Sequence, residues 1–241
     1  MLVAGLAAAN CYAQVKSRSL VSAKALYEPS MDILADGAWN TAPEIAVFTQ
    51  REPFEGKPAT EKTSVRMLYD KHSLYFLITG NDSEPRRIVA SELRRDADLS
   101  VDDNFTILIS PNHDGCNGYE FAVNPLGTQA DALIADQGRV NDSNWDGIWS
   151  SSARIDANGW TALVAIPFST LNFKTSQDVT LGINFRRFIR KKNEEDLWQS
   201  YLRIYGLERI SQAGELAHLE DIGSGRLLVF KPYGLTGFSF R

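Results

Sequence analysis

The sequence is poor in cysteine and histidine, and long hydrophobic runs are missing from it. Its 241 residues include two cysteines, Cys11 and Cys116, and three histidines. Cys11 lies close to the N-terminus in a segment typical of a signal peptide, and its removal would leave one cysteine, which cannot form an internal disulfide. No later apolar run approaches the length of a membrane-spanning helix. Stability must therefore come from a hydrophobic core.

A basic surface for nucleic acid is also lacking. The chain carries 25 Lys and Arg residues against 30 Asp and Glu residues, a formal net charge of -5, without a stripe of basic side chains. Such a charge pattern makes nucleic acid a poor partner. Hydrophobic residues make up 44% and charged residues 23%, which is the balance of a folded globular protein.

Recognisable catalytic motifs are absent. The sequence has no Gly-x-Ser-x-Gly elbow, phosphate-binding loop, dinucleotide fingerprint or His-Glu-x-x-His zinc helix. A glycoside hydrolase remains an alternative, because it needs two carboxylates facing one cleft rather than a motif. Asp103 and Glu120 are the acids that we would test for that role.

The first nine residues are apolar and small, and Ala13 can precede a signal-peptidase cleavage site. We interpret residues 1–13 as the remnant of a signal peptide, which implies export to the periplasm, the outer membrane or the medium. A buried N-terminal strand or helix is the alternative interpretation.

Alternation of apolar and polar residues dominates the chain from residue 20 onward and indicates strands with one buried face. A hairpin is expected where a turn at Asp70–Ser73 separates two such strands. The apolar rows are Val65, Met67 and Tyr69; Leu74 to Ile78; Phe105, Ile107 and Ile109; Tyr119, Phe121 and Val123; Trp160 to Ile166; and Val179 to Phe185. Further strands are expected around Leu197 to Ile204 and Leu216 to Ile222.

Helical periodicity is scarce. Short helical turns are expected at Asp36–Trp39 and at Pro167–Leu171, where proline suits a first helical position. About ten short strands separated by turns predict an all-β fold. The expected fold class is a two-sheet antiparallel β-sandwich, of jelly-roll or immunoglobulin-like type, with one or two short helical turns.

Five segments occur in an informative order: Asp36–Pro43, Val65–Asp70 with Leu74–Phe76, Asp102–Phe105, Gly118–Gly127, and Gly159–Trp160 running to Ile166–Phe168. As an ordered set they resemble the family 9 carbohydrate-binding modules, in the version found ahead of outer-membrane β-barrels in bacteria. The resemblance covers roughly residues 25 to 230.

This resemblance implies a β-sandwich that holds calcium and, in some members, grips sugar chain ends between tryptophans. Sugar-binding members carry a Glu and an Arg where this chain has Thr106 and Ala122, and a Trp where it has Ser100. The resemblance divides the chain into residues 1–13, a single carbohydrate-binding-like β-sandwich at 14–230, and the start of a further β region at 231–241.

Three functions follow as alternatives from the resemblance and the composition. The first is non-catalytic binding of a polysaccharide or oligosaccharide by an exported protein involved in polysaccharide recognition or catabolism. The second is a structural or docking domain in the periplasm, ahead of a C-terminal outer-membrane barrel in a longer protein. The third is a glycoside-processing hydrolase.

One loop has the oxygen spacing of a calcium site. Asp142, Asn144 and Asp146 occupy its first, third and fifth positions, and Gly147 occupies the sixth. The twelfth position is Ala153, so the Glu that closes an EF-hand is missing. Calcium is the predicted cofactor at this loop, and an Asn/Asp-rich turn is the alternative.

A second group of acids, Asp96, Asp98, Asp102 and Asp103, precedes the strand of Phe105. Crowded carboxylates repel one another unless a cation compensates them. Asp96, Asp102 and Asp103 are therefore further candidate metal ligands, with salt bridges to Arg94 and Arg95 as the alternative.

Two tryptophans are the candidate ligand face. Trp145 and Trp149 flank the loop at Asp146, where they either stack on a sugar or anchor the loop by burial. Trp160 falls in an apolar row of the core, and we expect Trp39 to close one end of the sandwich.

Arg186 and Arg190 are the remaining candidate ligand-binding residues. They belong to a basic segment that runs to Lys192 and is followed by the acids at 194–196. Their guanidinium groups suit bidentate contacts to hydroxyls or to a carboxylate of an acidic glycan. The alternative is a solvated hairpin whose opposite charges face water.

Overall fold

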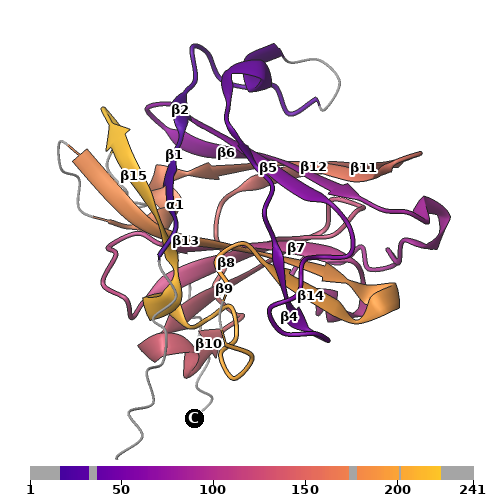
Figure 1. Ribbon diagram of the computed structural model, residues 1–241. Helices are drawn as coiled ribbons and strands as arrows, with labels where there is room; N and C mark the ends of the chain where they lie inside the picture. Colours follow the sequence, from indigo (N-terminus) through magenta and orange to yellow (C-terminus); the bar gives the residue numbers. More distant parts are fainter. Residues whose placement is uncertain (1–16, 33–36, 174–177, 201, 224–241) are drawn as a thin grey trace, which may run out of the picture.

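The computed structural model describes residues 17–32, 37–173, 178–200 and 202–223, which form two β-sheets packed face to face (Figure 1). The predicted all-β sandwich is confirmed. The segment interpreted as a signal peptide and the region at 231–241 lie outside the described residues, so they stay predictions together with the barrel. No helix in the described ranges has the length and hydrophobicity to cross a membrane.

The larger sheet has nine strands in the described part of the chain. Its order is β1 (Ser19–Val21), β15 (Gly214–Glu220), β13 (Asp178–Ile189), β7 (Asn104–Ser110), β8 (Gly118–Val123), β9 (Gln129–Ala135) and β10 (Val140–Asp142). β14 (Glu194–Leu197) pairs with β13 and with β4 (Thr49–Glu52), which extends the sheet beside β13.

The smaller sheet has six strands within the described ranges. Its order is β11 (Ser150–Asp156), β12 (Gly159–Pro167), β6 (Ser73–Asn81), β5 (Thr63–Tyr69) and β2 (Ala23–Lys24), with β3 (Glu44–Ile45) also paired to β5. The pairing is antiparallel except that β1 runs parallel to β15 and β2 runs parallel to β5. The expected antiparallel sandwich is therefore mixed at these two short pairings.

The core lies between the sheets and is built from the alternating residues that the sequence indicated. From β7 it receives Phe105, Ile107 and Ile109, all buried, and from β8 it receives Phe121 and Val123. Burying each such side chain stabilises the fold by about 1.5–3 kcal/mol relative to exposure. Because side chains alternate along a strand, the residues between them point to the outer face of the same sheet.

Short helices join the strands. They are η1 (Gly37–Thr41), η2 (Pro85–Arg87), η3 (Leu99–Val101), η4 (Asp136–Gly138), α1 (Phe168–Leu171), η5 (Arg190–Lys192) and η6 (Ile210–Gln212). The two expected helical turns correspond to η1 and α1. Trp39 of η1 packs with Leu68, Tyr75 and Leu163 in a cluster separate from the core, so it covers the outer face of the smaller sheet rather than closing an end.

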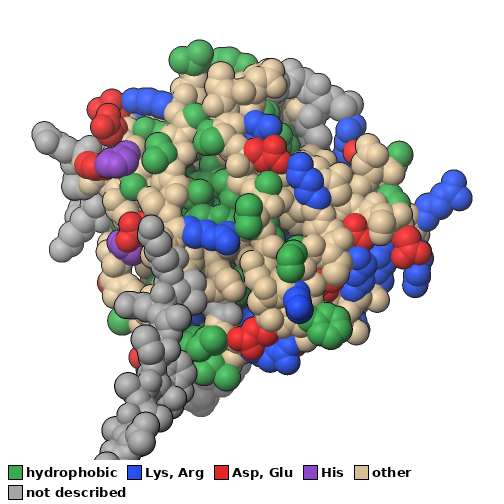
Figure 2. Space-filling model, in the orientation of Figure 1, with side chains coloured by type: hydrophobic (Ala, Val, Ile, Leu, Met, Phe, Trp, Pro, Cys, Tyr) green, Lys and Arg blue, Asp and Glu red, His purple; other side chains and the backbone are tan. Residues whose placement is uncertain are grey.

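Residues 202–213 cross the outer face of the larger sheet instead of forming the strand expected up to Ile204. β14 ends at Leu197, and the chain then turns so that Leu207 and Ile210 cover Leu108 of the sheet. This cover leaves the neighbouring part of the same outer face open to solvent. On the face drawn in Figure 2, basic and acidic side chains are mixed rather than gathered by sign.

Candidate functional site

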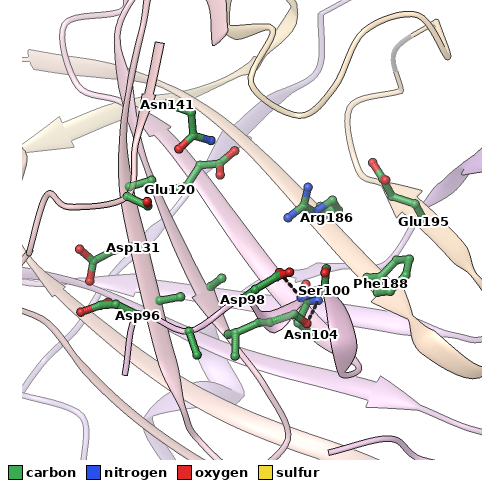
Figure 3. Close-up of a pocket in the computed structure, with 16 residues that line it drawn as sticks. Asp96, Asp98, Ser100, Asn104, Glu120, Asp131, Asn141, Arg186, Phe188 and Glu195 are labelled. Atoms are coloured by element: carbon green, nitrogen blue, oxygen red, sulfur yellow. Dashed lines mark hydrogen bonds between the residues drawn. The ribbon is translucent and has the colours of Figure 1, made fainter. Parts of the chain in front are cut away.

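A cavity of about 540 Å³ opens on the outer face of the larger sheet, beside the segment 202–213 (Figure 3). Strands β7, β8, β9, β13 and β14 supply its base, and the chain from Asp96 to Ser100 and residues Asn141 and Ser143 supply its walls. Ala122, Ala130 and Ala132 form a floor of small side chains. Their size is what leaves room above the sheet at this point.

Glu120 of β8 is an acid at one end of the cavity. Its side chain is buried, and its Oε1 has no hydrogen-bond partner. Burial raises the pKa of Glu120 to about 7; Glu208 and Glu195 add to the rise, and Arg186 opposes it. Glu120 therefore holds a proton at neutral pH far more readily than an exposed glutamate does.

Arg186 of β13 lies at the opposite end of the cavity from Glu120. Its Nη2 donates to Thr106 Oγ1 at 3.1 Å, and its Nη1 lies 3.9 Å from Glu208 Oε1. Its Nε is buried without a partner. Beside Arg186, Glu195 lines the cavity and forms a bidentate ion pair with Arg51, in which Nε and Nη2 donate to the two carboxylate oxygens at 2.7 and 3.0 Å.

The wall formed by residues 96–100 is fixed by its own hydrogen bonds. Asp98 caps η3 by accepting from the Ser100 amide at 2.9 Å. Asn104 at the start of β7 donates to the Leu99 carbonyl at 2.9 Å, while its Oδ1 is buried without a partner. Figure 3 shows Asn104 and Ser100 close together at this wall.

Three buried polar atoms without partners thus belong to side chains that line one cavity: Glu120 Oε1, Arg186 Nε and Asn104 Oδ1. Buried polar groups without partners are uncommon in folded proteins because each costs free energy. They are held on strands, whose backbone is rigid. The cavity can therefore offer two acceptors and one donor to a polar ligand.

The two candidate tryptophans lie elsewhere. Trp149 is buried, and its indole N–H donates to Asp131 Oδ2 at 2.8 Å. Trp145 is half-buried and packs on Tyr119 with ring centroids 4.6 Å apart. Both belong to the aromatic core with Phe121, so the structure places them as loop anchors rather than on the cavity wall.

At the candidate calcium loop, Arg95 bonds one of the three predicted ligands, Asp146. Arg95 Nη2 donates to Asp131 Oδ2 and Asp146 Oδ1, both at 2.8 Å, and to the Gly147 carbonyl at 2.9 Å. Asp142 accepts from the backbone amide of Asn144 at 3.0 Å, which is the contact of an Asx turn. The described residues therefore do not fit calcium at this loop.

The second acidic group does not converge on one point. Asp102 is fully buried, and its two oxygens accept from Ser91, Glu92 and Asn124 at 2.8 to 2.9 Å. Asp103 instead accepts from the Val89 amide at 2.8 Å and faces the interior. Asp96 lies 3.3 Å from Arg95. In the ranges that the structure describes, no three acids, histidines or cysteines are arranged to hold a metal.

Arg190 is exposed and donates to Asn193 within the β13–β14 turn, outside the cavity. Asp103 and Glu120, the acids considered for hydrolysis, come from opposite sides of the sheet. Glu120 lines the outer cavity, whereas Asp103 lies among interior charges that include Arg187. They cannot flank one glycosidic bond.

The positions singled out by the family resemblance meet at the cavity, and so does Arg186 among the residues predicted to bind ligand. Ser100 and Ala122 both line the cavity, and Thr106 is bonded to Arg186 at its edge. Sequence reasoning missed Glu120 and Asn104 as ligand-binding residues. The sequence did contain a signal for them: each lies next to a core residue along its strand, so its side chain points to the outer face of the sheet.

A sandwich that carries a small polar cavity on the outer face of one sheet has the architecture of a binding module. The model of the family described as "Carbohydrate family 9 binding domain-like" matches residues 31–202. The chain belongs to this family. No curated protein sequence matches the chain.

Solved structures share the fold at low sequence identity. A protein of Bacteroides uniformis ATCC 8492 to which carbohydrate binding has been ascribed has a TM-score of 0.68 at 14% identity, covering 83% of this chain and 99% of its own. A family 9 carbohydrate-binding module of Caldicellulosiruptor kristjanssonii in complex with cellotriose has a TM-score of 0.57 at 14% identity, covering 89% and 100%. The same module in complex with glucose gives 0.56 at 14% identity, with the same coverage.

Proposed function

We propose that the chain binds carbohydrate without cleaving it, in the cavity on the outer face of the larger sheet. In this proposal it serves an exported protein that recognises or helps to break down a polysaccharide. The apolar segment before Ala13 supports the export.

The observation that carries the proposal is the set of unpartnered polar atoms around the alanine floor. Sugar hydroxyls both donate and accept, so one ring can satisfy Glu120, Arg186 and Asn104 together. The volume of about 540 Å³ falls in the range of small-molecule sites. Phe188 on the wall offers an aromatic surface to the apolar face of a pyranose.

The family relationship supports the same location. Thr106 and Ala122 stand where sugar-binding members carry a Glu and an Arg, and this chain presents those two side-chain types from nearby positions. Glu120 is two residues before Ala122 on β8, and Arg186 lies opposite Thr106 on the neighbouring strand. A Glu and an Arg are thus both present at the site, but at different sequence positions from those in the sugar-binding members.

Calorimetric titration and affinity-gel electrophoresis test the proposal. Cellotriose and glucose are the first probes, followed by plant, algal and bacterial polysaccharides. Replacing Arg186 by Ala removes a charged hydrogen-bond donor and is expected to weaken binding about 10-fold or more. The matched control is Arg190→Ala, which removes the same side chain outside the cavity and is expected to leave binding unchanged. Failure of every glycan to bind, or equal weakening by both variants, contradicts the proposal.

A further inference from the structure

Acidic residues outnumber basic residues around the cavity. Five of the residues that line it are acids, Asp96, Asp98, Glu120, Asp131 and Glu195, although the Asp131 side chain is itself fully buried against Trp149. Arg186 is the one basic side chain among the described residues that line it. A ligand that enters the cavity therefore meets a negative environment.

Most of these acids are already compensated. Asp131 and Asp96 face Arg95, Glu195 is paired with Arg51, and Asp98 accepts the Ser100 amide. Glu120 differs from them, because it forms no ion pair with any residue in the described part of the chain and is nevertheless buried. A buried carboxylate without a counter-charge is costly.

Arg186 compensates Glu120 only in part: its charge lowers the pKa of Glu120, but burial outweighs it, and the two side chains form no ion pair. Glu120 pairs with Leu108 of β7 on one side, and Arg186 pairs with Thr106 of β7 on the other, so a whole strand separates them. Two strand spacings amount to about 10 Å between their backbones. Arg186 is directed instead to Thr106 and Glu208. Figure 3 shows the side chains of Glu120 and Arg186 on separate sides of the cavity.

We propose that the Glu120 end of the cavity takes a positively charged amine, so that the preferred ligand is a glycan with unacetylated amino sugars. This inference rests on the proposed function and concerns the same site. The ammonium group pairs with Glu120, while ring hydroxyls bond Asn104 and Arg186. A uronic acid would place its carboxylate in the same acidic surroundings and be repelled.

The lack of an ion pair at Glu120 provides the selectivity. A neutral sugar offers hydrogen bonds but adds no positive charge. An ammonium group favours the ionised carboxylate and lowers its pKa from about 7 toward the ordinary value of 4.5. Each unit of that shift means about tenfold tighter binding of the ligand to ionised than to protonated Glu120.

The test compares three trisaccharides of the same β-1,4 linkage: the glucosamine trimer, the N-acetylglucosamine trimer and cellotriose. Their affinities are measured by calorimetry at pH 7 with the full chain. The glucosamine trimer is expected to bind about tenfold more tightly than cellotriose. Glu120→Gln, which keeps the shape and removes the charge, is expected to abolish that preference while still binding cellotriose.

Glu55→Gln is the matched control, because Glu55 is exposed on a turn, does not line the cavity, and its replacement changes the net charge equally. It is expected to keep the preference, and thermal unfolding checks that both variants are folded. Equal or tighter binding of cellotriose by the unaltered protein, or a preference that survives Glu120→Gln, overturns the inference and leaves carbohydrate binding in place. Failure of all three sugars to bind overturns both proposals.

Discussion

Arg186 and Arg187 are consecutive residues of β13, and they project to opposite sides of the larger sheet. Arg186 lies on the cavity, whereas Arg187 is fully buried in the sandwich interior. Arg187 Nη2 donates to the Asn81 carbonyl at 2.6 Å, and Nη1 donates to the Lys62 carbonyl and to Thr63 Oγ1, both at 3.0 Å. One guanidinium thus joins the larger sheet to β5 and β6 of the smaller one.

Replacing Arg187 by Ala is expected to destabilise the protein by about 3–5 kcal/mol, because neighbouring buried acids such as Asp103 and Asp196 lose their counter-charge. Urea unfolding measures the loss. The neighbouring variant Arg186→Ala serves as the control and is expected to cost about 1 kcal/mol or less, since it removes one hydrogen bond at a half-buried position. Similar losses for both variants would show that the interior contacts of Arg187 are not what stabilises the fold.

Alternation of apolar residues predicted the strands well, because a strand with one buried face leaves a period of two in the sequence. The charged segment of β13 and β14 shows where that reasoning fails. A run of Arg and Lys followed by acids favours a solvated hairpin, yet Arg187, Glu194 and Asp196 are buried. Sequence alone does not show that the segment between β4 and β5 supplies partners from more than a hundred residues away, such as Thr60 for Glu194.

The cavity was predictable only in part, for a similar reason. Trp145 and Trp149 attract attention by residue type, but their position is decided by Asp131 and Phe121, which lie on strands that the loop packs against. Ala122, Ala130 and Ala132 are inconspicuous in the sequence. They define the site because three small residues from two neighbouring strands meet on one face.

The loop that carries Asp146 and Trp149 is expected to loosen when Arg95 is replaced by Ala. Asp131, whose side chain is fully buried, would keep the Gly147 amide and the Trp149 indole but lose its cation. A charged hydrogen bond of this kind contributes about 2 kcal/mol. Urea unfolding and hydrogen exchange at residues 142–149 measure the effect. Arg94→Ala, at an exposed neighbour paired with Glu92, is the control, and an equal loss there would contradict the role of Arg95.

Calcium is expected to leave the melting temperature of the protein unchanged. A ligand stabilises a fold only to the extent that it binds the native state, and Arg95 already compensates Asp131 and Asp146. Thermal unfolding with millimolar calcium and with a chelator checks this. A rise in melting temperature that Asp146→Ala abolishes would instead place the ion at the loop.

The free energy of unfolding is expected to vary with pH because of the titration of Glu120. Its pKa in the folded protein is raised from 4.5 to about 7, so the folded state holds the proton more tightly than the unfolded state does. The contribution of Glu120 to stability is fully present below pH 4.5 and is lost as the pH rises through about 7. Because each pKa unit is worth 1.36 kcal/mol, the loss amounts to at most about 3 kcal/mol.

Glu120→Gln removes this titration. The stability of the unaltered protein relative to the variant is therefore expected to fall between pH 4.5 and 7 and to level off above. Asp196, whose pKa is raised to about 8, titrates in both proteins, so its contribution cancels in the difference. Urea unfolding at intervals across this range gives the curve, with Glu55→Gln as the exposed control. A difference that stays constant with pH would mean that Glu120 is solvated in solution, and the buried carboxylate without an ion pair on which the selectivity for amines depends would then be absent.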